Sequence, residues 1–182
     1  MAKRRLKPSP PDTADEARSR ALRWLRLRDR SIEELRQRLS ALDFSERTID
    51  ETLSRLKAER LIDDARLAAH AVDRELSRRP AADALFERRL SARGIEAGLI
   101  RRAIDGATQG QSELDRARAL VTQLSRGEGA DARARRRIFG TLARRGFAED
   151  VAMEAMDAVL GPEPLEREAS PRDEEHPHEE AS

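Results

Sequence analysis

Residues 35–53 read LRQRLSALDFSERTIDETL, residues 86–104 read FERRLSARGIEAGLIRRAI, and residues 138–156 read IFGTLARRGFAEDVAMEAM. A shift of 51 positions aligns the first segment with the second, and a further shift of 52 aligns the second with the third. The aligned segments are apolar at the same places. Leu39, Leu90 and Leu142 form one such set. Apolar positions that recur at a fixed period are typical of repeat proteins, so the chain is predicted to contain three related units.

Each unit also has a residue that favours a turn at the same place. Asp43, Gly94 and Gly146 occupy this position, and residues of these types tolerate the left-handed conformation that often ends a helix. The following residue is apolar in every unit and is expected to close the turn onto the core: Phe44, Ile95 and Phe147. Matching turn residues and matching core positions together argue against a chance alignment.

Both within these three segments and in the rest of the chain between about residues 14 and 160, apolar residues recur with the helical period of 3.6 residues. In the second predicted helix, for example, Ile32, Leu35 and Leu39 share one face. No segment alternates with a period of two residues, so no sheet is expected. Residues that break or cap helices divide the chain into nine predicted helices, at 14–28, 32–42, 46–59, 64–78, 81–92, 96–107, 112–126, 130–144 and 148–160. The predicted fold class is therefore all-α, with three units of three helices each.

This periodicity sets the expected domain organisation. Repeat 1 is expected at 14–61, repeat 2 at 62–110 and repeat 3 at 111–161. The basic segment 1–13 and the acidic segment 162–182 are rich in proline and charge and lack apolar periodicity, so we expect both to be disordered.

Composition excludes several classes of protein. Of the residues, 39% are charged and only 3% aromatic, which favours many thin helix interfaces over one thick core. The chain has no cysteine, so disulfides, thiolate metal sites and cysteine nucleophiles are excluded. No signal peptide and no run of about 20 apolar residues is present, so we expect a soluble cytoplasmic protein without a membrane span.

The net charge of +1 hides a separation of charge along the chain. Residues 162–182 contain eight acidic residues and two arginines, which is a net charge of −6 with histidine neutral. The rest of the chain therefore carries +7. A basic body of this kind is attracted to polyanions.

No group of side chains indicates catalysis or a metal site. Ser31 and Glu34 have the spacing of a capping box, in which each side chain accepts a hydrogen bond from the backbone of the other. Asp63, although followed by a second aspartate, stands where a helix N-cap is needed and is interpreted as a cap. Gly94 and Gly146 are interpreted as C-terminal caps. We therefore expect no catalytic residue, no metal and no cofactor.

Arginines recur along the second and third repeats and form the predicted surface for a partner or nucleic acid. A row of guanidinium groups can follow a phosphate backbone or an acidic protein groove. Because aromatic residues are scarce, any contact with nucleic acid is expected to be made to phosphates and to be weak and non-specific in sequence. The predicted residues are Arg74, Arg78, Arg79, Arg88, Arg89, Arg101, Arg102, Arg136, Arg137, Arg144 and Arg145.

The sequence resembles the RecX family, the regulators of the RecA recombinase. Residues 28–35 (RDRSIEEL) are similar to the family's first-repeat pattern R-x-x-S-x-x-E-L, and residues 61–67 (LIDDARL) are similar to its L-I-D-D-x-R-F. The leucine-to-glycine turns at 90–95 and 142–147 match as well, and the resemblance covers about 15–160. Two residues depart from the pattern: Leu67 replaces the usual Phe, and Arg60 stands where Gly commonly ends a helix.

The resemblance implies three tandem repeats related to helix-turn-helix units, in an elongated and curved molecule. It also implies that the protein binds in the groove of the RecA filament on single-stranded DNA. There it is expected to restrain ATP hydrolysis, strand exchange and filament growth. No cofactor, no active site and no membrane association are implied, and we expect a monomer.

Two other functions remain open from the sequence. A DNA-binding regulator of helix-turn-helix ancestry would bind DNA tightly and with sequence preference in the absence of RecA. The shortage of polar residues suited to reading bases at any helix start argues against it. A helical-repeat scaffold that binds an unrelated protein is the second alternative.

Overall fold

The computed structural model describes residues 11–126 and 131–162, and within these ranges it contains helices and no strands. The helices are α1 (Ala14–Leu25), α2 (Ile32–Ser40), α3 (Glu46–Ala58), α4 (Asp64–Leu76), α5 (Asp83–Ser91), α6 (Ala97–Thr108), α7 (Glu113–Ser125), α8 (Ala132–Arg144) and α9 (Glu149–Leu160). This confirms the predicted all-α fold. The largest difference is at the end of α1, which was predicted to reach residue 28 and ends at Leu25.

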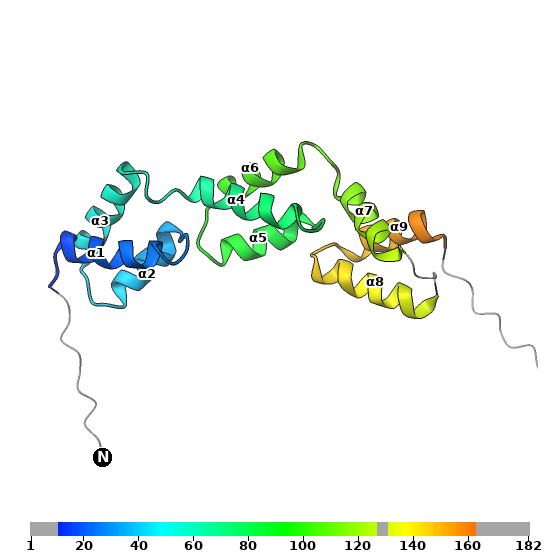
Figure 1. The fold of residues 1–182 in the computed structure, drawn as a ribbon, viewed down its shortest axis with the longest axis horizontal. Helices are drawn as coiled ribbons and strands as arrows, with labels where there is room; N and C mark the ends of the chain where they lie inside the picture. The colour runs from blue at the N-terminus through cyan, green and yellow to red at the C-terminus, as the bar shows by residue number, and fades with distance from the viewer. Residues whose placement is uncertain (1–10, 127–130, 163–182) are drawn as a thin grey trace, which may run out of the picture.

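The helices pack in three groups of three, which we call the first trio (α1 to α3), the second trio (α4 to α6) and the third trio (α7 to α9). In each trio the first helix packs against the third: α1 against α3, α4 against α6 and α7 against α9. The trios follow one another along the long axis of an elongated molecule (Figure 1). Helices α2, α5 and α8 lie along one long edge, and α3 and α6 lie along the opposite edge.

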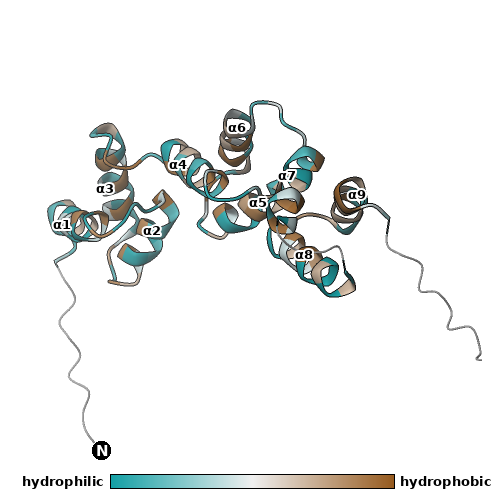
Figure 2. Cartoon of the chain, turned by 45° about the vertical axis from the view of Figure 1, so that its right-hand side comes forward, coloured by the Kyte–Doolittle hydropathy of each residue, from teal (hydrophilic) through white to brown (hydrophobic). Residues whose placement is uncertain are grey.

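Each trio has its own small hydrophobic core. Leu39, Leu90 and Leu142, which the repeat aligns, are all buried, one in each core. The hydrophobic faces of the helices point into their trios and the hydrophilic faces point outward (Figure 2). Two residues cross the limits predicted for the repeats: Ile62 packs in the first core, and Ala82 packs in the third. The cores are therefore separate, but adjacent trios share residues at their boundaries.

Hydrogen-bonding side chains at the helix starts explain several boundaries. Ser31 Oγ accepts from the backbone N–H of Glu34 over 3.0 Å, and Glu34 Oε2 accepts from the backbone N–H of Ser31 over 3.0 Å. This is the reciprocal capping box that the sequence predicts. Asp63 caps α4 by accepting from the backbone N–H of Arg66 over 3.0 Å. Helices α5, α6 and α9 begin without a side-chain cap.

The predicted turn residues all adopt a left-handed backbone. Asp43 has a φ of 63°, Gly94 of 74° and Gly146 of 90°. Arg60, which stands where the family that this sequence resembles commonly has a glycine, also has a positive φ of 56°. The backbone therefore adopts a glycine-like conformation there even though arginine has a Cβ that disfavours it.

The segments expected to be disordered fall mostly outside the described residues, which exclude 1–10 and 163–182. Thr13, at the end of the first of these segments, is ordered as the N-cap of α1. Its Oγ1 accepts from the backbone N–H of Glu16 over 3.4 Å. Among the described helices, none is long and apolar enough to cross a membrane.

Candidate partner-binding surface

The surface that a partner can reach depends first on which arginines the fold uses for itself. Arg93, in the turn between α5 and α6, reaches from the second trio to the first. Its Nη2 donates to Glu34 Oε2 over 2.9 Å and to the backbone oxygen of Asp29 over 3.1 Å. In return, Ser31 Oγ donates to the backbone oxygen of Arg93 over 2.5 Å. One arginine and one serine thus join the two trios.

The junction between the second and third trios repeats this arrangement. Arg145 aligns with Arg93, and its Nε donates to the backbone oxygen of Pro80 over 2.9 Å, where Pro80 aligns with Asp29. The guanidinium also pairs with the Glu75 carboxylate. The backbone N–H of Ala82, which aligns with Ser31, donates to the backbone oxygen of Arg145 over 3.1 Å. The contact from the arginine to a backbone oxygen therefore recurs between aligned residues at both junctions, whereas the carboxylates that pair with the two arginines, Glu34 and Glu75, are not aligned.

The glycines next to these arginines bring the trios into close contact. A Cβ built on Gly94 would lie 2.4 Å from Cβ of Glu33, and a Cβ on Gly146 would lie 2.9 Å from the backbone nitrogen of Leu85. Both distances are too short for a real side chain, so each position requires glycine for packing as well as for its φ. At the aligned position of the first trio, Asp43 adopts the same left-handed backbone with a φ of 63°.

Arg145 was predicted to contact a partner, but the structure engages its guanidinium within the protein. Its side chain is only 15% exposed, and its donors are used by Glu75, Pro80 and Arg79 within the protein. The residue is therefore part of the inter-trio junction. Arg89 is also partly used, because its Nη1 donates to Glu75 Oε2 over 3.1 Å, although more than half of its side chain is exposed.

Most of the other predicted arginines are exposed. Arg144 donates to Thr141 Oγ1 of its own helix over 3.0 Å, and Arg137 also has an interaction. The remaining side chains have no ion pair or hydrogen bond with any residue that the structure describes. They are Arg74, Arg78, Arg79, Arg88, Arg101, Arg102 and Arg136.

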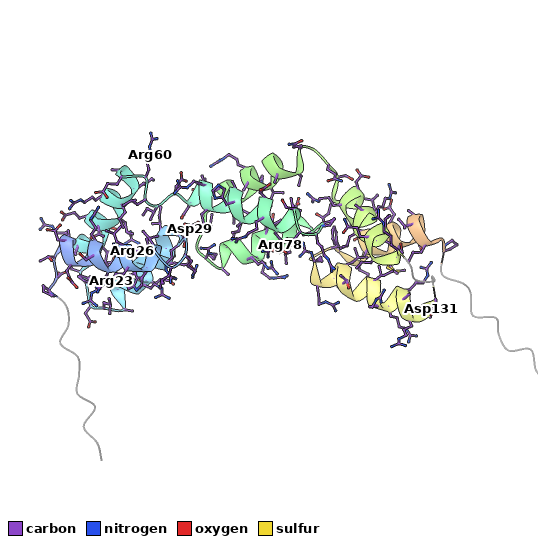
Figure 3. All side chains as sticks on the ribbon, in the orientation of Figure 1. Arg23, Arg26, Asp29, Arg60, Arg78 and Asp131 are labelled. Carbon is purple, nitrogen blue, oxygen red and sulfur yellow. The ribbon has the colours of Figure 1, made fainter. Side chains whose placement is uncertain are left out.

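These exposed arginines do not form one row of equivalent positions. In the repeat alignment, the third-repeat residues equivalent to Arg101 and Arg102 are Met153 and Glu154, which are not basic. Arg88 and Arg136 belong to α5 and α8 on one long edge, whereas α6 lies on the opposite edge (Figure 1). Arg78 lies in the turn after α4 (Figure 3). Positive charge is thus distributed around the second and third trios instead of along a single face.

The buried and half-buried carboxylates serve structure. Burial raises the pKa of Glu34, but hydrogen bonds from Arg28, Arg93 and the backbone of Ser31 outweigh burial and lower it to about 2. Burial raises the pKa of Asp64, whose Oδ1 accepts from the backbone N–H of Ile32 over 3.1 Å. Within the described ranges, no group of histidine and carboxylate side chains is placed to hold a metal ion.

Comparison with known proteins identifies the family. Residues 17–56 match the RecX first three-helix domain. The chain is 35% identical over 158 residues to the regulatory protein RecX of Mycobacterium ulcerans (strain Agy99), with 85% of this chain and 91% of the relative covered. The chain belongs to the RecX family. It is also 39% identical over 153 residues to the regulatory protein RecX of Corynebacterium efficiens, with 78% of this chain and 72% of that protein covered.

Solved RecX structures share the fold. The crystal structure of RecX from Lactobacillus salivarius matches with a TM-score of 0.63 and 20% identity, over 80% of this chain and 96% of the other. A second crystal structure of a regulatory protein RecX matches with a TM-score of 0.57 and 23% identity, over 79% of this chain and 71% of the other. These comparisons place the chain among the RecX regulatory proteins.

Sequence reasoning missed the role of Arg93, which is absent from the predicted surface. A signal was present, because Arg93 and Arg145 are aligned by the repeat and each precedes an aligned glycine. An arginine that recurs at an equivalent position next to a packing glycine is a candidate for the contact between repeats.

Proposed function

We propose that this protein is a non-enzymatic inhibitor of RecA that binds in the groove of the RecA filament on single-stranded DNA. Bound there in the cytoplasm as a monomer, it restrains ATP hydrolysis, strand exchange and filament growth. The family membership supports regulation of RecA in general, and the charge of the protein supports the mode of binding.

The observation on which the proposal rests is the set of exposed arginines on the second and third trios that have no partner among the described residues. The side chains of Arg88, Arg101 and Arg136 are free to donate to phosphates or carboxylates, and the helices that present them lie on opposite long edges. A groove encloses its occupant on more than one side. Charge that is distributed around an elongated molecule therefore suits a groove better than it suits a flat surface.

Contacts to phosphates account for affinity without sequence preference. Arginine forms two parallel hydrogen bonds with phosphate or carboxylate, and such bonds are among the stronger ones in proteins. Trp24 is the only tryptophan, and it is engaged by Arg38 at 5.5 Å from the ring centroid. Stacking on bases therefore contributes little, and any contact with DNA is expected to be weak and made through phosphates.

Binding to RecA filaments assembled on single-stranded DNA, compared with binding to the same DNA alone, tests the proposal. Co-sedimentation should show much tighter binding to the filament than to the DNA. Binding should weaken as salt rises, and each phosphate contact to a single strand should contribute about −0.7 to the slope of log affinity against log salt. Equal binding to naked DNA and to the filament would contradict the proposal and favour a DNA-binding regulator.

A further inference from the structure

A shallow apolar groove of about 320 Å³ lies on the third trio and has no occupant among the described residues. Its apolar lining consists of Phe139 and Gly140 from α8 together with Met153 and Met156 from α9. Met153 is 41% exposed, which is unusual for a large hydrophobic side chain in this protein. Arg135 and Arg136 complete the lining, so the groove is apolar with a basic edge.

We propose that the acidic segment 163–182 of this same chain binds in this groove. Leu165 occupies the apolar part, and carboxylates next to it pair with the guanidinium of Arg136. The occupant is thus a segment of the chain itself, bound by one hydrophobic anchor and by opposite charge.

The position of the end of α9 places the segment beside the groove. Arg135, which lines the groove, donates from Nη2 to the backbone oxygen of Gly161, directly after α9. Its Nη1 lies 3.7 Å from the Asp157 carboxylate. The residue that follows α9, Gly161, is therefore hydrogen-bonded to a residue that lines the groove.

The distance from this point is short enough for Leu165 to reach the apolar lining. Four extended residues from Gly161 to Leu165 span up to about 13 Å. Along α9, Met156 lies about 7.5 Å back from Gly161 and Met153 lies about 12 Å back, at 1.5 Å per helical residue. A chain that turns back after Pro162 has three residues, about 10 Å, left for its return. This brings Leu165 level with Met156 and lets its side chain extend towards Met153.

The chemistry of the segment matches the groove. Leu165 is the only large apolar residue in 163–182, and Glu163, Glu166 and Glu168 surround it. The whole segment has eight acidic residues and two arginines. Arg136 is exposed and has no partner among the described residues, and Nε of the buried Arg135 also lacks one. A leucine flanked by carboxylates therefore complements an apolar groove with a basic edge.

Binding of the segment has a consequence that rests on the proposed function. Arg136 belongs to the predicted partner-binding surface, so a segment that pairs with Arg136 competes with an anionic partner for the third trio. The segment would then weaken binding to the filament until the filament displaces it. The tests below do not use RecA, so they can fail or succeed independently of the proposed function.

Oxidation of Met153 by hydrogen peroxide, followed by mass spectrometry, reports directly whether the groove is covered. Met153 should be oxidised several-fold more slowly in the full chain than in a variant that ends at residue 162. Met156 is only 4% exposed and should be oxidised slowly in both, which makes it an internal reference for the integrity of the fold. Equal rates for Met153 in the two proteins would overturn the proposal.

Two variants of the segment separate the hydrophobic anchor from charge. Leu165→Asp should restore rapid oxidation of Met153. Ala169→Asp adds the same charge four residues after the leucine and should keep Met153 protected. The proposal is overturned if neither variant or both variants lose protection. It is also overturned if protection rises with protein concentration and sedimentation shows a dimer, because a second copy would then be the occupant.

Discussion

The guanidinium of Arg93 lies 2.9 Å from Oε2 of Glu34, across the junction between the first and second trios. Glu34 also caps the helix in which it lies, so one carboxylate both starts α2 and holds the next trio. Arg145 pairs with Glu75 in the same way at the second junction. These two ion pairs hold adjacent trios together with the backbone contacts and the close packing at Gly94 and Gly146.

Stability is expected to fall in acid because of Glu34. Its pKa is about 2 in the folded protein, below the ordinary value of 4.5. The carboxylate therefore stabilises the fold fully above about pH 4.5 and loses this contribution as the pH falls towards 2. The loss is about 3 kcal/mol at most. Urea unfolding between pH 7 and pH 3 measures it, and Glu34→Gln should flatten the profile relative to the parent. If Glu34→Gln and the exposed Glu51→Gln give the same profile, Glu34 is not the group responsible.

Replacing Gly94 with alanine should disturb the first junction. The added Cβ would lie 2.4 Å from Cβ of Glu33, and a φ of 74° is unfavourable for alanine. We expect Gly94→Ala to lower the free energy of unfolding by more than the roughly 1–2 kcal/mol of the backbone conformation alone. Gly106→Ala is the matched control, because its Cβ meets nothing within 4 Å and the residue lies within α6, where alanine is the better helix former. Thermal unfolding of both variants checks the prediction, which fails if they behave alike.

Replacing Arg145 should destabilise the protein much more than replacing its neighbour Arg144. Arg145→Ala removes hydrogen bonds to Glu75 and to two backbone oxygens, and we expect a loss of about 1–3 kcal/mol. Arg144→Ala removes an exposed side chain and should change stability by no more than about 0.5 kcal/mol. Denaturant unfolding of the two single variants gives the comparison. A stability loss in Arg144→Ala as large as in Arg145→Ala would show that the junction has been misplaced.

Arg60 is a site at which glycine should stabilise the protein. Its φ of 56° costs an L-residue about 1–2 kcal/mol, which glycine would avoid. The greater freedom of glycine in the unfolded chain offsets part of that gain. We therefore expect Arg60→Gly to raise the free energy of unfolding by about 0.5–1 kcal/mol. Figure 3 shows Arg60 extending away from the turn after α3, so little packing is lost. Arg60→Ala keeps the left-handed strain and should give no such gain.

The helices and their caps could be predicted because their determinants are local. Ser31 and Glu34 are three residues apart, and the apolar face of each helix is visible in its own segment. The junctions could not be predicted in the same way. Arg93 and Arg145 donate to backbone oxygens of Asp29 and Pro80, and a backbone oxygen leaves no trace in the sequence because every residue has one. Their carboxylate partners do not align either, since the repeat places Leu85 opposite Glu34.

The predicted surface was limited by the same lack of long-range information. Adjacent arginines in the sequence, such as Arg144 and Arg145, turned out to have different roles because only one of them reaches the preceding trio. Arginines on α5 and α6 are close in sequence but belong to helices on opposite edges of the molecule (Figure 1). The runs of arginine in the sequence therefore showed that the second and third repeats are basic. They did not show on which faces of the molecule the arginines lie.

ATP hydrolysis by RecA on single-stranded DNA, titrated with this protein, tests the central claim most directly. The parent protein should lower the rate of hydrolysis. Arg101→Ala/Arg102→Ala should require several-fold more protein for the same effect at moderate salt. Arg26→Ala/Arg47→Ala removes the same charge from exposed arginines of the first trio that pair with no described residue, and it should act like the parent. Hydrolysis that the parent protein leaves unchanged at every concentration would contradict the account.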